Sequence, residues 1–334
     1  MELTTVWFLL IAVLWTGYFV LEGFDFGVGI LLPLLGRTEA DRRVLVGSIG
    51  PVWDGNEVWL LVAGGAMFAA FPEWYATLFS GFYLPLFLIL LSLIVRGVAL
   101  EYRNKSDSPR GWDRAFFWGS LGPAFLWGVA FADIVRGVPL DARHEFTGTL
   151  LTLLNPHALL GGLATLALFT FHGAVFLALR TTGELRDHAR EAARTLGLLA
   201  LVSGGAFLVE TQVATGTAAT WVGVVAAAAG IVAAIMATSR GRDGWAFAAN
   251  AAAIVAVTVT LFGGLWPDVM PALDPANSLT VHNAASTPYT LTVMTWVAAI
   301  FTPLVLAYQG WTYWIFRRRL GGETASRGAG RAAS

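Results

Sequence analysis

The sequence contains no cysteine and few charged residues. Of its 334 residues, 13% are Asp, Glu, Lys or Arg, whereas average proteins carry about 25%. The absence of cysteine excludes disulfides, iron–sulfur clusters and thiolate metal sites. A net charge of −1 identifies no partner, and nothing in the sequence predicts binding to nucleic acid. What is abundant is apolar: 56% of the residues are hydrophobic, including 14 Trp and 22 Phe, which is typical of membrane proteins with aromatic belts.

Long apolar segments alternate with short polar loops along the chain. A transmembrane helix needs about 20 predominantly apolar residues. We predict nine, at residues 6–35, 43–70, 74–97, 115–136, 156–180, 194–213, 217–239, 244–265 and 288–316. No basic residue precedes the first segment, so it is predicted to be a span and not a cleaved signal peptide. The fold class is therefore an all-α, multi-pass membrane protein.

The basic residues are distributed unevenly between alternate loops. Nineteen of the 21 Lys and Arg residues fall on one predicted side, and only Arg136 and Arg143 fall on the other. Basic loops stay in the cytoplasm, which predicts an N-terminus outside and a C-terminus inside the cell. Residues 1–320 are predicted to form a single transmembrane domain. The Gly-, Ala- and Arg-rich segment 321–334 is predicted to be a disordered cytoplasmic tail.

Four carboxylates lie inside the first two predicted spans. Glu22 and Asp25 occupy the first, and Asp54 and Glu57 occupy the second. From the helical rise, Asp25 lies about 18 Å and Asp54 about 16 Å from the cytoplasmic end of its span. Each pair has i, i+3 spacing, so its members are expected to share a helix face. A carboxylate in hydrocarbon is costly unless it is protonated, paired or hydrated, so the four predict handling of protons or cations.

Glu101, at the cytoplasmic end of the third span, extends this set toward the cytoplasm. The predicted order, from the cytoplasm inward, is Glu101, then Asp54 and Asp25, then Glu57 and Glu22. Aromatic side chains such as Trp53 would exclude lipid from the space around these five acids. In the alternative interpretation, the acids only anchor helices by pairing with Arg96 or Asn56.

The histidines offer no pair of axial haem ligands. His144, His188 and His282 fall in predicted loops, and His157 lies near the outer end of a span. His172 is the only one well inside a span, and it has no second histidine at a useful position. Since a haem held by two histidines needs both, we predict that this chain binds no haem. A hydrogen-bonded helix contact is the expected role of His172.

Several motifs resemble those of subunit II of the cytochrome bd quinol oxidases. Glu22-Gly-Phe-Asp-Phe-Gly-Val-Gly29 is similar to the motif of that family's first helix, and Trp53-Asp-Gly-Asn-Glu-Val-Trp59 to that of its second. Arg96-Gly-Val-Ala-Leu-Glu-Tyr-Arg103 resembles the end of its third helix. Further similar segments are Ala63–Pro72, Thr290–Val297 and Tyr308…Trp311…Tyr313-Trp314. The resemblance extends over residues 1–320 and is loose through 195–262.

The resemblance implies a fold of two four-helix bundles plus one peripheral helix. It implies a partner, subunit I, that carries two b-type haems, haem d and the quinol site, while this chain binds no cofactor. It also implies that the complex reduces dioxygen to water in the bacterial cytoplasmic membrane and generates proton-motive force without pumping. Asp54 and Glu101 match acids of a cytoplasmic proton path, although some members have Asp at the second position. Arg96, Arg103, Trp53 and Asn56 are the supporting residues of the same motifs.

Two other functions compete with an oxidase subunit that conducts protons. A stand-alone proton-coupled transporter predicts interrupted helices in corresponding halves of the chain, but the sequence interrupts a span only once, around Gly50-Pro51. A purely structural subunit would use the acids as anchors. The sequence leaves open which quinone is the electron donor, whether a quinone or lipid binds here, and whether small accessory subunits join the complex.

Overall fold

The computed structural model describes residues 2–321, and most of them are helical. The α-helices are α1 (Leu3–Leu35), α2 (Glu39–Ile49), α3 (Trp53–Ala70), α4 (Pro72–Gly81), α5 (Tyr83–Tyr102), α6 (Pro109–Arg136), α7 (Leu150–Leu153), α8 (Pro156–Arg180), α9 (Gly183–Thr215), α10 (Thr220–Ser239), α11 (Asp243–Leu265) and α12 (Pro288–Ile315). Two 3₁₀ turns, η1 (Arg103–Lys105) and η2 (Pro275–Asn277), and two strands, β1 (Asp268–Met270) and β2 (Leu279–Thr280), complete the fold. Of the tail predicted to be disordered, 321–334, all but Gly321 lies outside the described residues.

Eight helices of the described chain are long and apolar enough to cross a membrane, one fewer than the nine predicted spans. The difference is the second predicted span, 43–70, which is divided between α2 and α3. Pro51 has no amide hydrogen and cannot continue α2, and Val52 leaves the helical region with φ −129°. The polar residues at the start of α3 lower its mean hydropathy, so α3 is not among the eight helices that are apolar enough to cross a membrane. The third predicted span, 74–97, begins in α4 and continues in α5 after a break at Phe82.

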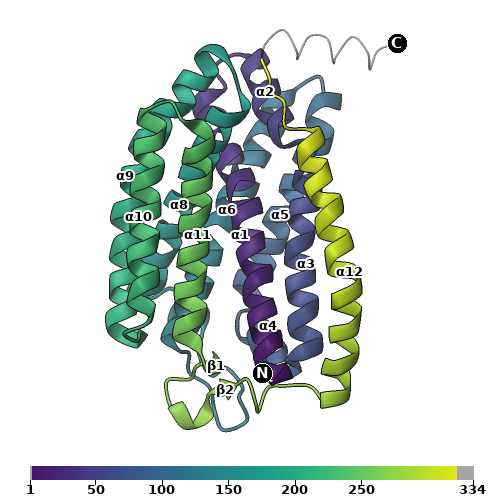
Figure 1. Ribbon diagram of the computed structural model, residues 1–334, viewed down its shortest axis with the longest axis vertical. Helices are drawn as coiled ribbons and strands as arrows, with labels where there is room; N and C mark the ends of the chain where they lie inside the picture. The colour runs from purple at the N-terminus through teal and green to yellow at the C-terminus, as the bar shows by residue number, and fades with distance from the viewer. Residues whose placement is uncertain (1, 322–334) are drawn as a thin grey trace.

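α1 lies in the middle of the helices and contacts both of their groups (Figure 1). On one side it contacts α3 and α6, and α6 in turn packs on α5. On the other side α8, α9, α10 and α11 pack around one another, each against the next, and α1 contacts α8 and α11. The crossing of α1 and α8 requires glycine at Gly27, since a Cβ there would overlap the backbone of Gly173. Small residues of this kind let membrane helices approach closely.

α12 is the helix least embedded in the rest of the chain. Among its 28 described residues only Leu291 is buried, and its contacts are mainly with α1 and α3. Near its start, the indole nitrogen of Trp7 donates to the Leu291 carbonyl at 3.3 Å. Beyond its end the chain reaches α8, where the amide of Leu320 donates to the carbonyl of Arg180 at 2.7 Å. α12 is therefore attached at both ends and largely exposed between them.

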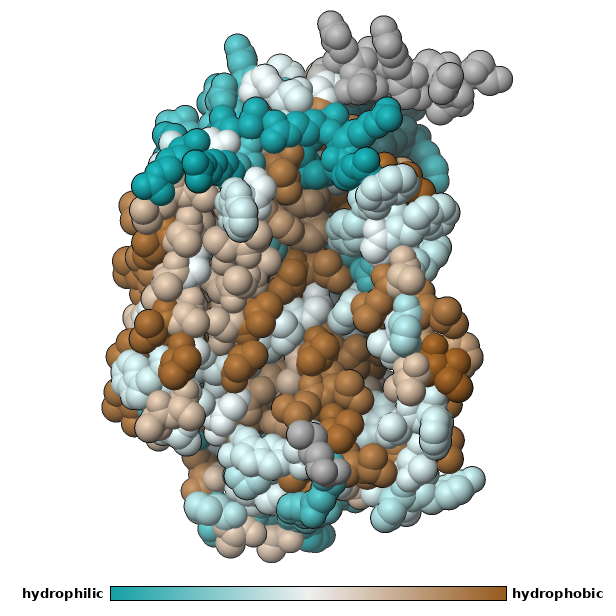
Figure 2. Space-filling view, viewed as in Figure 1, coloured by the Kyte–Doolittle hydropathy of each residue, from teal (hydrophilic) through white to brown (hydrophobic). Residues whose placement is uncertain are grey.

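The two ends of the helices differ in polarity. Figure 1 places the N-terminus and the β1–β2 hairpin at one end, and α2 with the last described residues at the other. Figure 2 shows the most hydrophilic residues gathered at this second end, beside a largely apolar middle. We call it the basic end; it comprises the segments that follow α1, α5, α8, α10 and α12. The inference that the basic end faces the cytoplasm still rests on the distribution of Lys and Arg in the sequence.

Candidate functional site

One guanidinium and three carboxylates meet inside the helices. Nη1 of Arg96, from α5, lies 2.8 Å from Glu22 Oε2 and 3.9 Å from Glu57 Oε2. Its Nη2 lies 3.8 Å from Asp25 Oδ2. The side chains of Arg96, Glu22 and Asp25 are fully buried, whereas that of Glu57 is 23% exposed. We call these four residues the Arg96 cluster.

The Arg96 cluster contains more acids than bases. An arginine stays protonated in proteins, so its single charge cannot balance three ionised carboxylates. No other base of residues 2–321 forms an ion pair with these acids. An uncompensated charge among apolar helices is costly, and protons on the carboxylates remove that cost. The cluster is therefore suited to take up and release protons.

In each fully buried acid, one oxygen is paired with Arg96 and the other is not. Asp25 Oδ2 accepts a hydrogen bond from Asn56 Nδ2 at 2.7 Å and faces Arg96, and Glu22 Oε2 faces Arg96 alone. Within the described residues, neither oxygen of Glu22 nor Oδ1 of Asp25 has a hydrogen-bond partner, and Glu22 Oε1 and Asp25 Oδ1 have no ion-pair partner either. These two oxygens are free to accept a proton, since a carboxylate has acceptor capacity on both oxygens.

Arg96 contributes mainly charge to the cluster. None of its side-chain nitrogens meets the geometry of a hydrogen bond to another described residue, although Nη1 lies close to Glu22. Its guanidinium lies over the ring of Phe26, 5.0 Å from the centroid, which is a favourable position for a cation. The sequence predicts a supporting role for Arg96, and the structure shows that, within residues 2–321, it is the one cation paired with the buried acids.

The two acids of α3 point to different surroundings. Glu57 faces Arg96, whereas Asp54 is exposed and lines a groove between α3 and α12. The i, i+3 spacing led us to expect that the two acids share a helix face. The rotation of α3 about its axis, however, brings only Glu57 toward Arg96 and leaves Asp54 at the groove. Asp54 therefore lies outside the Arg96 cluster.

The groove has a volume of about 550 Å³, and two hydrogen bonds between its lining residues link α3 to α12. Trp59 Nε1 donates to Gln309 Oε1 at 2.8 Å. The hydroxyl of Tyr313 donates to Asn56 Oδ1 at 2.6 Å. Asn56 thus bonds to Tyr313 on the groove side and to Asp25 on the inner side. Through this amide, the wall of the groove is connected to the Arg96 cluster.

Glu101 and Trp53 lie outside the Arg96 cluster. The side chain of Glu101 is 60% exposed, and its Oε2 lies 3.9 Å from Lys105 Nζ. This agrees with the expected position at the end of the third span, at the surface of the basic end. Trp53 is half-buried, and its ring would meet a Cβ placed on Gly97 of α5.

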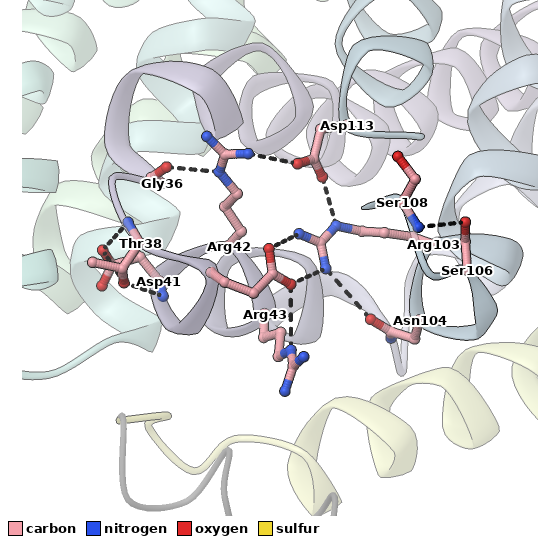
Figure 3. Close-up of polar contacts among 11 residues, drawn as sticks. Gly36, Thr38, Asp41, Arg42, Arg43, Arg103, Asn104, Ser106, Ser108 and Asp113 are labelled. Atoms are coloured by element: carbon pink, nitrogen blue, oxygen red, sulfur yellow. Dashed lines mark hydrogen bonds and ion pairs between the residues drawn. The ribbon is translucent and has the colours of Figure 1, made fainter. Parts of the chain in front are cut away.

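Arg103 belongs to a separate network at the basic end (Figure 3). Its Nε donates to Asp113 Oδ1 at 2.6 Å, and Asp113 Oδ2 accepts from Arg42 Nη1 at 2.9 Å. Its two terminal nitrogens donate to Glu39 at 3.1 and 3.2 Å. These contacts join the start of α2, the end of α5 and the start of α6. Arg103 therefore supports helix ends and does not contact the Arg96 cluster.

Two polar residues, His172 in the core and Tyr313 on α12, illustrate what the sequence could and could not reveal. His172, as expected, makes helix contacts: its Nε2 lies 3.0 Å from the Val20 carbonyl and its Nδ1 3.0 Å from Asn250 Nδ2. Tyr313 was not predicted as a site residue, because it lies 257 residues from Asn56 and its only signal was an aromatic motif. Among residues 2–321, no three His, Asp or Glu side chains are arranged to hold a metal ion.

Comparisons with known proteins agree along nearly the whole chain. The model of the family described as "Cytochrome bd terminal oxidase subunit II" matches residues 3–316. The "Cytochrome bd ubiquinol oxidase subunit 2" of Bacillus subtilis (strain 168) is 40% identical over 329 residues, which cover 96% of this chain and 97% of that protein. The "Cytochrome bd-I ubiquinol oxidase subunit 2" of Escherichia coli (strain K12) is 36% identical over an alignment of 371 residues including gaps. The alignment covers 96% of this chain and 96% of that protein.

A solved structure shows the same fold. A chain of the bd oxidase from Geobacillus thermodenitrificans superposes with a TM-score of 0.78. The alignment covers 94% of this chain and 99% of that chain at 17% sequence identity. At this identity the likeness concerns the arrangement of the helices alone.

Proposed function

Because the chain belongs to the cytochrome bd terminal oxidase subunit II family, we propose that it is the haem-free subunit of a complex that oxidises quinol and reduces dioxygen to water. The names of the relatives, ubiquinol oxidase subunit 2, support a quinol as electron donor and a subunit I as partner. Subunit I carries the b-type haems, haem d and the quinol site in this proposal. The complex lies in the bacterial cytoplasmic membrane, which the eight apolar helices support.

The contribution of this chain is a path by which protons move from the basic end into the membrane. Reduction of dioxygen to water consumes protons, and hydrocarbon does not supply them. The observation that carries the proposal is the Arg96 cluster, in which three acids surround one cation. Protons taken from the cytoplasm for this reaction generate proton-motive force without pumping.

The acids have different tasks along this path. Glu101 collects protons at the surface, and Asp54 takes them up in the groove. Asp25, Glu22 and Glu57 hold them in the cluster, where Arg96 limits the excess negative charge. A stand-alone transporter is disfavoured because the relatives that match 96% of the chain are oxidase subunits.

The substitution Asp54→Asn tests the path, because it keeps the size of the side chain and removes its proton acceptor. We expect oxygen consumption by the purified complex, with quinol as donor, to fall at least about tenfold, since a positioned proton-transfer group contributes about 10²–10⁴-fold. Absorption spectra of the haems and the ratio of the two subunits should stay unchanged, because Asp54 is exposed and makes no ion pair among the described residues.

The matched control is Asp187→Asn, which makes the same chemical change at the basic end on a side chain that is 74% exposed. Its turnover should equal that of the unmodified complex. An assembled Asp54→Asn complex with normal turnover and normal proton uptake would contradict the proton path.

A further inference from the structure

A line of hydrogen bonds runs from α12 to the buried acids. The Tyr313 hydroxyl donates to Asn56 Oδ1 at 2.6 Å, and Asn56 Nδ2 donates to Asp25 Oδ2 at 2.7 Å. The same oxygen of Asp25 lies 3.8 Å from Arg96 Nη2. Tyr313 is therefore the only described residue of α12 that connects to the Arg96 cluster through consecutive side-chain hydrogen bonds.

Chemistry sets the direction of both bonds. An ionised carboxylate only accepts hydrogen bonds, so the NH₂ group of Asn56 has to face Asp25. The amide oxygen then faces Tyr313, whose hydroxyl has to donate. Asn56 is fully buried, and turning its amide around would bring two oxygens together at Asp25. The ionised Asp25 therefore sets the direction of the amide, and the Tyr313 hydroxyl, which can donate or accept, holds Asn56 in place by donating to its oxygen.

We infer that Tyr313 is a positioning residue of the proton path, which rests on the proposed function above. Through Asn56 it keeps a hydrogen-bond donor on Asp25 Oδ2 and leaves Asp25 Oδ1 as the oxygen that accepts the proton. Asn56 does not carry the proton itself, because an amide nitrogen exchanges its hydrogens far less readily than a carboxyl group. The Tyr313–Asn56 pair orients Asp25, and the proton moves between acids.

The attachment of α12 supplies a matched control for this inference. Two side-chain hydrogen bonds join α12 to α3: Tyr313 to Asn56, and Trp59 to Gln309. Both hold the same two helices together, but only the first leads to Asp25. Tyr313→Phe and Gln309→Leu each remove one of these bonds and keep a side chain of similar size. A purely structural role predicts equal effects of the two changes.

The experiment compares Tyr313→Phe, Gln309→Leu and Asp25→Asn in the purified two-subunit complex. Redox-induced infrared difference spectra report the carboxyl stretching bands, and loss of a band in Asp25→Asn identifies that of Asp25. We expect Tyr313→Phe to shift this band and to lower turnover about fivefold, the effect of losing one net hydrogen bond. Gln309→Leu should leave the band in place and change turnover less than twofold.

The possible results separate the inference from the proposed function. An unshifted Asp25 band in Tyr313→Phe, or an equal shift in Gln309→Leu, would overturn the positioning role. If Asp25→Asn assembles and keeps full turnover, the proton path itself is wrong, whatever the other two variants show. Should Asp25→Asn fail to assemble, Asp25→Glu identifies the band by displacing it.

Discussion

The Arg96 cluster and the contacts around Asp243 combine the same two kinds of charge in opposite proportions. Arg96 is one base among three acids. Asp243, at the start of α11, is one acid among three bases, and its side chain is 1% exposed. It accepts hydrogen bonds from Arg186, from Arg190 Nε at 2.8 Å and from Arg319 Nη2 at 3.4 Å. Arg190 also lies 3.6 Å from Asp187, so this site has three bases and two acids. Each site thus leaves charge uncompensated, but of opposite sign.

The difference between the two sites is where the uncompensated charge lies. The side chains of Arg186, Arg190 and Arg319 are 26%, 19% and 37% exposed, so water solvates their charge. Glu22 and Asp25 are fully buried, and among the described residues their charge is offset only by Arg96 and by the hydrogen bond from Asn56 to Asp25. The Asp243 site is therefore a static link between α9, α11 and the segment after α12. The Arg96 cluster is the site that we propose to take up and release protons.

The largest effect is expected from Arg96→Met. This change keeps most of the side-chain volume and leaves the carboxylates without a cation. Removing one partner of a buried ion pair lowers the stability of the folded protein by about 3–5 kcal/mol. We expect little assembled complex in membranes, measured by haem content and by the amount of this chain. Arg96→Lys keeps the charge and should restore part of the assembly. Normal assembly of Arg96→Met would mean that the acids are stable without Arg96, which would break the comparison.

A smaller effect is expected from Asp243→Asn. The arginines lose a charge-assisted partner but remain in contact with water, so we expect about 1–3 kcal/mol of lost stability. Thermal unfolding of the purified complex should show a lower midpoint, while the turnover of the folded complex stays unchanged. A fall in turnover as large as that of Asp54→Asn would show that the Asp243 site is not merely structural.

The smallest effect is expected from Arg319→Gln, which sharpens the role of the third arginine. Its contact with Asp243 is the longest of the three and the most exposed, and exposed ion pairs contribute about 0–1 kcal/mol. The backbone bond from Leu320 to Arg180 remains in the variant. Thermal unfolding should therefore match that of the unmodified complex to within a few tenths of a kcal/mol. A loss equal to that of Asp243→Asn would assign the stability of this site to Arg319.

Much of the architecture followed from composition and local pattern. Apolar segments predicted most helices, because a membrane span has to satisfy its backbone internally and bury apolar side chains in lipid. The exception was 43–70, where the polar residues around Asp54 and the break at Pro51 outweigh the apolar average. The sequence also showed that Glu22 and Asp25 are candidate site residues, because a charged side chain inside a membrane span is rare and costly whichever way it points.

Which acid meets which partner did not follow from the sequence. Asp54 and Glu57 are three residues apart, yet one faces the groove and the other faces Arg96. The difference depends on how α3 is rotated against α1 and α12, and on side chains far away in the chain. Tyr313 is the clearest case, since its partner Asn56 is 257 residues away.

By itself, the sequence determined that this protein is a bundle of membrane helices with costly acids in its first spans, because hydropathy and charge act residue by residue. Only the tertiary structure decided that three of those acids share Arg96, that Asp54 stands apart in a groove, and that Tyr313 reaches Asp25 through Asn56. Ion pairs and hydrogen bonds act over a few ångströms. Their partners are therefore set by how helices pack, which no local pattern in this chain specifies.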